Sequence, residues 1–372
     1  MARYRTDVFR VAMSGPGDVS AVLDLCRSGA LDPAHIVAVF GKTEGNGGVN
    51  DFTREYSCSA LATALAPLLA TSSAAVEQRI AMVMSGGTEG ILTPHATIFA
   101  RVPETEDMAG RSDGRLAIGI ASTRIFEPWE IGRGAQIEQT AHAVRAAMRE
   151  GGILRTEDVH WVQIKCPLLT AGRVRVARLA GHDVCTESAY KSMGYSRGAS
   201  ALGVAVALGE IESEIAEEAV LADWSLASGV ASSSAGIELL HSVIVVLGNS
   251  EEVAGNYKIG HDVMRDAIDA RAVLAAFRDA GLGSDANPLD FDPGQIVNVL
   301  AKADPSPDGL VRGYRHTMLD DTDISATRHV RAAVGGIVAG VAGFPAIFVS
   351  GGAEHQGPPG GVLVAVIAFS PA

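Results

Sequence analysis

The sequence predicts an α/β protein made of three similar repeat units. Apolar, β-branched runs typical of buried strands alternate with alanine-rich stretches of helical character. The same ordered set of elements occurs three times in 372 residues, a length that suits two or three units of roughly 150 residues each. Three such units around a pseudo-three-fold axis would bring equivalent side chains to a single central active site.

The first repeated element is an apolar run that ends in a lysine. The runs span residues 36–42, 159–165 and 296–302, which end in Lys42, Lys165 and Lys302. Short runs of this kind predict buried strands. Each lysine is therefore expected where a strand ends and a loop begins.

The second repeated element is a hydroxyl residue followed by an arginine. It occurs as Thr53-Arg54, Ser196-Arg197 and Thr327-Arg328. Each pair precedes an alanine-rich stretch, and we expect helices over residues 54–70, 198–211 and 330–343. Serine and threonine are favoured at helix N-caps, where free amide protons attract anions and carbonyl oxygens. The three arginines are therefore predicted to bind substrate carbonyls.

The third repeated element is a serine followed by small residues, in the form Ser-[Gly/Ala]-Gly-x-Glu. It begins with Ser85-Gly86, Ser234-Ala235 and Ser350-Gly351. Small residues let a ligand approach the backbone amides closely. Each of these turns is therefore predicted to hold one carbonyl of the substrate.

The repeats also predict the unit boundaries. Residues 103–110 are typical of a linker. We expect unit A over residues 1–104, unit B over 113–250 and unit C over 256–372.

Composition excludes several functional classes. The net charge of −13 disfavours binding to nucleic acid or anionic membranes, and no basic block offsets it. The uncharged residues 332–349 contain Pro345 and four glycines, so they are predicted to form a core helix and strand instead of a membrane span. The four cysteines form no C-x-x-C pair, which favours free thiols and a cytoplasmic location.

The repeated residues suit covalent catalysis without a catalytic metal. Serine needs a base, and lysine can serve when burial and nearby cations lower its pKa. No H-E-x-x-H or phosphate-loop motif occurs, and isolated histidines such as His95, His160 and His261 are expected to be structural. Spacing alone leaves open which of the three serines attacks.

A glycine- and proline-rich segment offers one site for a cation. Residues 351–361 could turn several backbone carbonyls toward a hard cation, with Asp304 as an acidic partner. An ordinary turn fits the same residues. No cofactor is expected to be required for the chemistry, and a structural cation is the alternative to an ordinary turn.

Three stretches, residues 41–54, 192–203 and 350–359, resemble the cyanuric acid hydrolase and barbiturase family of ring-opening amidohydrolases. Residues 223–228 and 314–319 extend the resemblance over nearly the whole chain. The resemblance implies three similar α/β units around one active site, usually assembled as a homotetramer.

The resemblance also implies roles for individual residues. Lys165 matches the family's base and Ser234 its nucleophile, while Lys42 and Lys302 are supporting lysines. The predicted substrate-binding residues are Arg54, Ser85, Gly86, Arg197, Ser234, Ala235, Arg328, Ser350 and Gly351. The family's metal is usually magnesium, so the resemblance implies a possible structural Mg²⁺ or similar hard cation. Its predicted ligands are Asp304, Ala353, Gln356, Gly357, Pro358 and Gly361. Asp304 stands where the family typically has glutamate, so water could lie between its shorter side chain and the metal.

The leading hypothesis is hydrolysis of cyanuric acid, a small planar heterocycle, to carboxybiuret by a serine-lysine mechanism. Barbituric acid is the alternative substrate within the family, and residues near Arg328, including Ile324, are expected to influence that choice. A hypothesis from another class is a protein that binds planar heterocycles without catalysis.

Overall fold

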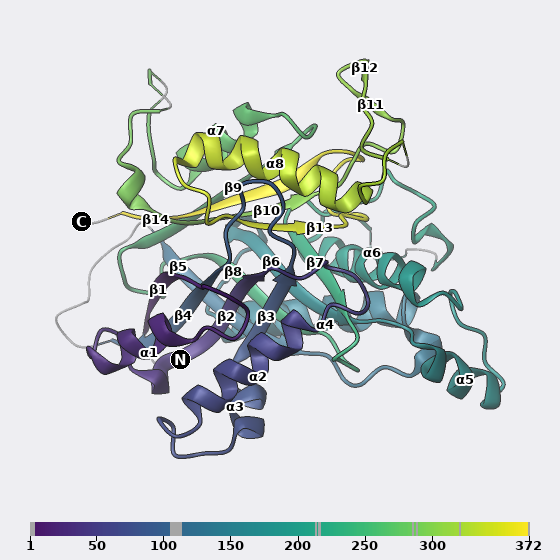
Figure 1. The fold of residues 1–372 in the computed structure, drawn as a ribbon, viewed down its shortest axis with the longest axis horizontal. Helices are drawn as coiled ribbons and strands as arrows, with labels where there is room; N and C mark the ends of the chain where they lie inside the picture. Colours follow the sequence, from purple (N-terminus) through teal and green to yellow (C-terminus); the bar gives the residue numbers. More distant parts are fainter. Residues whose placement is uncertain are drawn as a thin grey trace.

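Three four-stranded sheets meet in the middle of the molecule, with the helices outside them (Figure 1). The computed structural model describes residues 4–104, 114–212, 214, 217–284, 286–287, 289–319 and 321–370. Helices α7 and α8 lie at the top of Figure 1, α2 and α3 at the bottom, and α5 and α6 at the right. The predicted α/β fold with three similar units is confirmed.

Each sheet is formed by one continuous part of the chain. The first contains β1 (Tyr4–Ala12), β2 (Ile36–Thr43), β3 (Ala81–Gly86) and β4 (His95–Pro103). The second contains β5 (Arg115–Ser122), β6 (Val159–Pro167), β7 (Ala231–Gly236) and β8 (Val243–Ser250). The third contains β9 (Tyr257–Met264), β10 (Ile296–Ala303), β13 (Phe348–Gly351) and β14 (Val362–Phe369). A small hairpin, β11 (Leu310–Val311) and β12 (Tyr314–Arg315), lies in the third part.

The three sheets share one topology. Their strand orders are β1-β4-β2-β3, β5-β8-β6-β7 and β9-β14-β10-β13, and in each sheet only the last pair is parallel. The strand that comes second along the chain in each unit (β2, β6 and β10) also begins with a register shift. The shifts lie at Ile36/Ala38, Val159/Trp161 and Ile296/Asn298. Residues 103–110, the predicted linker, lie almost wholly outside the described residues, and the exact unit boundaries stay predictions.

The helices occupy equivalent places in the three units. Those that follow the first strand of each sheet are α1 (Ser20–Arg27), α4 (Gly134–Glu150) and α7 (Ala270–Asp279). Those that follow the second strand are α2 (Thr53–Leu65) with α3 (Ser73–Arg79), α5 (Ala171–Leu179) with α6 (Ala189–Leu208), and α8 (Ala326–Ala342).

The helix starts differ from the sequence prediction. Ser196 lies inside α6, because Ser188 is the N-cap and its side chain accepts a hydrogen bond from the Lys191 amide. Thr327 is the second residue of α8, and Phe52 takes the N-cap position of α2. The Ser/Thr-Arg pairs are therefore not N-caps, and Arg197 reaches the site from the side of a helix.

The core has a central part and three outer parts. Large side chains from all three sheets, including Phe40, Trp161 and Phe348, are fully buried together between the sheets. Three further clusters fill the space between each sheet and its own helices. Burying such a side chain contributes about 1.5–3 kcal/mol, so the units are held together by the same kind of packing that stabilises each one.

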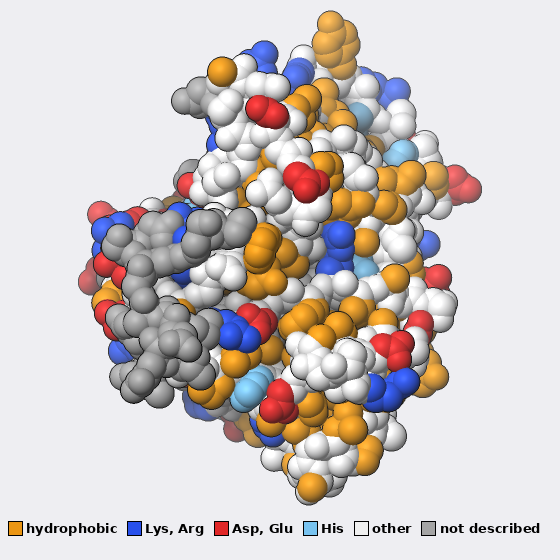
Figure 2. All heavy atoms as spheres, turned by 90° about the vertical axis from the view of Figure 1, so that its left-hand side faces the viewer, with side chains coloured by type: hydrophobic (Ala, Val, Ile, Leu, Met, Phe, Trp, Pro, Cys, Tyr) orange, Lys and Arg blue, Asp and Glu red, His pale blue; other side chains and the backbone are white. Residues whose placement is uncertain are grey.

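Three further observations concern membrane crossing, the charge of the surface and the cysteines. Among the described residues, every helix is too short or too polar to cross a lipid bilayer, and residues 332–349 divide between the end of α8 and the start of β13. Figure 2 shows one face of the molecule, where acidic, basic and apolar side chains are intermixed. The four cysteines are free thiols.

Candidate active site

Each unit places a lysine and a serine side by side on two parallel strands. The paired positions are Lys42 with Ser85, Lys165 with Ser234, and Lys302 with Ser350. Side chains at paired positions of neighbouring strands point to the same face of the sheet. The strand register, which the sequence does not specify, therefore brings together residues 43 to 69 positions apart.

The three lysines link the units in a ring. Each lysine Nζ donates a hydrogen bond to the carbonyl of the residue before the serine of a neighbouring unit: Lys42 to Val349 at 2.7 Å, Lys302 to Ser233 at 2.9 Å and Lys165 to Met84 at 3.2 Å. Unit A thus contacts unit C, unit C contacts unit B, and unit B contacts unit A. The cyclic pattern is that of a pseudo-three-fold axis passing through the site.

A pocket on this axis gathers Lys165 and most of the predicted substrate-binding residues. Its lining is Gly47, Arg54, Met84, Ser85, Gly86, Lys165, Met193, Arg197, Ser234, Ala235, Arg331, Ser350 and Gly351. All the predicted substrate-binding residues except Arg328 belong to it. Lys42 and Lys302 are fully buried behind the lining.

The third arginine that lines the pocket is Arg331, three positions after the predicted Arg328. Arg331 is 3% exposed, and its guanidinium donates to both carboxylate oxygens of Glu89 at 2.8 and 2.5 Å. Arg328 is exposed and lines a wider hollow outside the pocket. The two residues lie three positions apart on α8, close to one helical turn, and the repeat pattern in the sequence matched the outer one.

Arg197 has the same environment as Arg331. Its guanidinium donates to both carboxylate oxygens of Glu354 at 2.7 and 2.5 Å. In both pairs the glutamate follows the pocket serine by four positions and belongs to the next unit around the ring. These bidentate pairs hold two of the three arginines at the rim of the pocket.

The lysine-serine contacts differ among the units. Lys42 Nζ lies 3.2 Å from Ser85 Oγ, and Lys302 Nζ lies 3.5 Å from Ser350 Oγ. In unit B, Ser234 Oγ is buried and has no hydrogen-bond partner among the described residues. Lys165 Nζ instead lies 3.1 Å from the carboxylate of Glu238.

Burial lowers the pKa of all three lysines. The pKa of Lys42 falls well below its usual value because of burial, and burial together with Arg197 lowers the pKa of Lys302 to about 7. Burial also lowers the pKa of Lys165, while the carboxylate of Glu238 opposes that shift. A neutral amine beside a serine hydroxyl can act as a general base.

The pocket opens into a hollow of about 650 Å³, a size typical of small-molecule sites. The hollow and the pocket share Gly47, Met193, Arg197, Arg331 and Gly351. Ile324 is 49% exposed and precedes Ser325, which lines the hollow. Ile324 therefore lies near the entrance and not in the inner pocket.

The predicted cation segment forms a turn packed against unit B. His355 adopts a positive φ of 58°, and the buried side-chain oxygen of Gln356 accepts a hydrogen bond from the Ser233 amide at 2.7 Å. The Gln356 side-chain oxygen is therefore already held by unit B. Asp304 lies near Glu354, and burial followed by that carboxylate raises the pKa of Asp304 to about 7.

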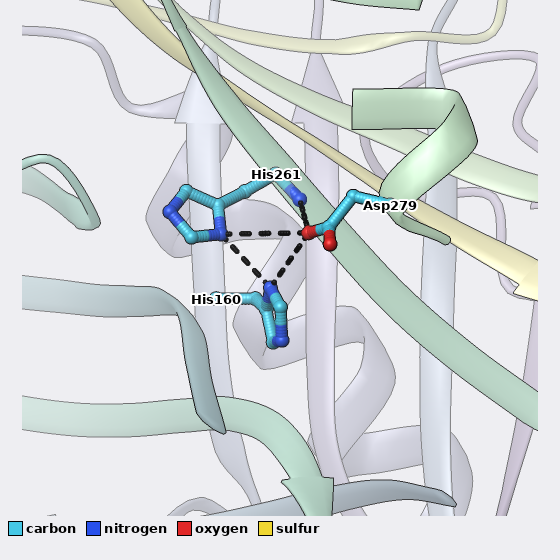
Figure 3. A group of neighbouring side chains, drawn as sticks. All are labelled: His160, His261 and Asp279. Carbon is cyan, nitrogen blue, oxygen red and sulfur yellow. Dashed lines mark hydrogen bonds and ion pairs between the residues drawn. The ribbon is translucent and has the colours of Figure 1, made fainter. Parts of the chain in front are cut away.

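Two histidines and an aspartate form a second polar cluster between units B and C (Figure 3). His160 Nδ1 lies 2.8 Å from His261 Nδ1 and 3.3 Å from a carboxylate oxygen of Asp279. The amide of Asn249 bonds the backbone of Ile259 through both its oxygen and its nitrogen, and that nitrogen lies 3.0 Å from His160 Nε2. His160 Nε2 must therefore accept, which leaves its proton on Nδ1.

This position of the proton favours a hydrogen-bonded contact over a metal site. A metal ion would need the lone pair of the His160 Nδ1 atom that carries the proton. The proton is instead donated toward His261, whose pKa burial lowers to about 4. The cluster is thus a hydrogen-bonded contact between two units, and the structural role expected for these histidines stays a prediction.

The sequence reasoning missed Arg331 and the three glutamates Glu89, Glu238 and Glu354. A signal for the glutamates was present, because glutamate ends each copy of the Ser-[Gly/Ala]-Gly-x-Glu element. No comparable signal marked Arg331, since valine and not a hydroxyl residue precedes it.

Comparison with known proteins agrees with this architecture. Residues 7–369 match the family model described as amidohydrolase ring-opening protein. The cyanuric acid amidohydrolase of Bradyrhizobium diazoefficiens is 61% identical over 97% of both chains, and that of Pseudomonas sp. strain ADP is 54% identical over 98% of this chain and 99% of the relative. A solved cyanuric acid hydrolase, described as an evolutionary innovation by structural concatenation, has a TM-score of 0.93 and 53% identity over 99% of this chain and all of that one. The chain therefore belongs to the family of ring-opening amidohydrolases and is an enzyme of that class.

Proposed function

We propose that the enzyme opens the ring of cyanuric acid. One observation carries the proposal: three lysine-serine pairs converge on one pocket through a cyclic set of hydrogen bonds. Cyanuric acid is planar and presents three equivalent carbonyls, so its symmetry matches that of the pocket. The cyanuric acid amidohydrolases that share most of the sequence support the same substrate.

Binding in this proposal uses the three serine turns. Ser85, Ser234 and Ser350 with the following residues Gly86, Ala235 and Gly351 would each face one ring carbonyl. Arg54 and Arg197 would donate to two carbonyls, and Arg331, which lines the pocket, is a better third donor than the exposed Arg328. Donors fixed around a carbonyl also stabilise the oxyanion that forms on attack.

The covalent step is proposed for Ser234 and Lys165. Neutral Lys165 takes the proton of the Ser234 hydroxyl while Oγ attacks a ring carbonyl carbon. The ring C–N bond then breaks, and the lysine ammonium returns the proton to the departing nitrogen. Water hydrolyses the resulting ester of Ser234 to release carboxybiuret, which loses CO₂ to give biuret. Lys42 and Lys302 bond Ser85 and Ser350 and would fix those hydroxyls toward the other carbonyls.

A structural cation at the turn after Ser350 is a secondary part of the proposal. The oxygen donors of this turn suit Mg²⁺. The ligands would be the carboxylate of Asp304, directly or through water, and the backbone carbonyls of Ala353, Gln356, Gly357, Pro358 and Gly361. Such an ion would stiffen the turn that bonds the Ser233 amide. A homotetrameric assembly and a cytoplasmic location stay predictions from the sequence.

The test is turnover of the purified enzyme on two rings. Cyanuric acid should be consumed, as followed by its ultraviolet absorbance, with biuret as the final product identified by mass spectrometry. Barbituric acid, in which CH₂ replaces one ring N–H, should give a much lower kcat/KM. Preference for barbituric acid would replace the proposed substrate, and binding without turnover of either ring would contradict the hydrolytic function.

A further inference from the structure

The glutamate after the pocket serine has a different partner in unit B. In units A and C, Glu89 and Glu354 bond an arginine of the preceding unit. In unit B, Glu238 lies against a lysine of its own unit, with a carboxylate oxygen 3.1 Å from Lys165 Nζ. Neither Lys42 nor Lys302 has a carboxylate among the hydrogen-bond partners that the described residues provide.

The glycines that follow the serines show the same difference. A Cβ atom added to Gly87 would lie 2.5 Å from Arg331, and one added to Gly352 would lie 2.6 Å from the Arg197 guanidinium. A Cβ atom on the equivalent Gly236 would lie 2.3 Å from the carboxylate of Glu238. An arginine thus covers the glycine in two units, whereas in unit B the glutamate folds back over it.

The displaced glutamate leaves the third arginine without its carboxylate. Arg54 Nη2 donates to the carbonyl of Gly48 at 3.0 Å, and Arg54 Nε is buried without a hydrogen-bond partner among the described residues. Arg54 lines the pocket close to Lys165. Arg54 therefore gives none of its donors to a carboxylate in these contacts, whereas Arg197 and Arg331 each give two.

We propose that Glu238 is a positioning residue that completes a Ser234-Lys165-Glu238 set and makes unit B the one that performs the covalent step. The inference rests on the proposed function. When Lys165 takes the Ser234 proton, an ammonium forms beside the ionised carboxylate of Glu238, which stabilises that charge as the third member of a catalytic triad does. Glu238 gains and loses no proton, and the proton passes from Ser234 Oγ to Lys165 and then to the departing nitrogen.

The charge of Glu238 supports this role. Burial raises the pKa of Glu238, but Lys165 and Arg54 outweigh it and lower the pKa to about 2. The carboxylate therefore stays ionised over the working range of pH. Its side chain is 21% exposed, so replacing it does not remove a core residue.

The experiment compares Glu238→Gln with Glu89→Gln on the full enzyme. Loss of the Glu238 charge should lower kcat for cyanuric acid at least tenfold. It should also move the acid limb of the kcat/KM profile to lower pH, because a lysine without an adjacent anion loses its proton more readily. Glu89→Gln makes the same chemical change beside Arg331 and should leave the position of that limb unchanged.

Glu238→Asp, which keeps the charge one methylene farther away, should shift the limb less than Glu238→Gln in the same direction. Circular dichroism checks that each variant is folded. If Glu238→Gln does not fold, the test rests on Glu238→Asp. An acid limb that stays in place in both Glu238 variants, or moves equally in Glu89→Gln, would overturn the inference. If the unchanged enzyme does not hydrolyse cyanuric acid, the proposed function fails instead, so the two failures are distinguishable.

Discussion

Unit B differs from units A and C although all three have the same topology. In units A and C the lysine bonds its own serine and the glutamate pairs with an arginine. In unit B the serine hydroxyl has no partner among the described residues and the lysine pairs with the glutamate. One repeated set of residues thus gives two kinds of arrangement within one pocket.

The difference shows how a symmetric site can become chemically directional. A symmetric ring can bind with any of its carbonyls at any serine, so binding alone does not select a nucleophile. Changing the partner of one glutamate distinguishes one lysine and frees one arginine without altering the fold. The two arginine-glutamate pairs then fix the sides of the pocket, while the lysine and serine of unit B are left for the chemistry.

The largest expected effect comes from removing the serine hydroxyls one at a time. Ser234→Ala should lower kcat about 10³-fold or more, because the nucleophile is lost and only binding and oxyanion stabilisation persist. Ser85→Ala and Ser350→Ala should mainly raise KM, since each removes one donor to a carbonyl that is not attacked. Steady-state kinetics of the three variants tests this, and equal losses of kcat in all three would contradict a special role for unit B.

The next largest effect concerns stability and separates the two candidate arginines of α8. Arg331→Met should lower the free energy of unfolding by about 3–5 kcal/mol, because it leaves the carboxylate of Glu89 without its buried partner. Arg328→Met, at an exposed position, should change it by no more than about 0.5 kcal/mol. Denaturant titration measures both.

Adding Glu89→Gln to Arg331→Met should recover part of the lost stability, because the unpaired charge is then removed. Equal losses in the two single arginine variants would show that Arg331 does not hold the rim of the pocket.

The smallest expected effect is a pH dependence of stability from Lys302. Its folded-state pKa of about 7 lies below the unfolded value of about 10.4, so between these values the unfolded chain binds the extra proton. The free energy of unfolding should therefore rise with pH from about 7 to 10 by more in the unchanged enzyme than in Lys302→Met. Thermal denaturation at several pH values measures the difference, and Lys191→Met at an exposed position is the control. A constant difference between enzyme and Lys302→Met over this range would contradict the lowered pKa.

The candidate site was predictable to different degrees at different residues. The lysines and serines were recognisable because each occupies a fixed place in a repeated strand, and the strand register brings each pair together. The arginine pattern selected Arg54 and Arg197, which line the inner pocket, and Arg328, which lines the outer hollow. A Ser/Thr-Arg pair marks local sequence, whereas the arginine that lines the pocket depends on how the helix is rotated against its sheet.

The sequence by itself determined the α/β class, the three repeats and the order of lysine, arginine and serine in each. These properties follow from local residue patterns and from element order, which do not depend on contacts between units. The tertiary structure decided which residues meet across the units: the ring of lysine contacts, the pairing of Arg331 with Glu89, and the turn of Glu238 toward Lys165. Such choices depend on burial and charge balance among residues that lie between 69 and 307 positions apart, which no single segment of the sequence contains.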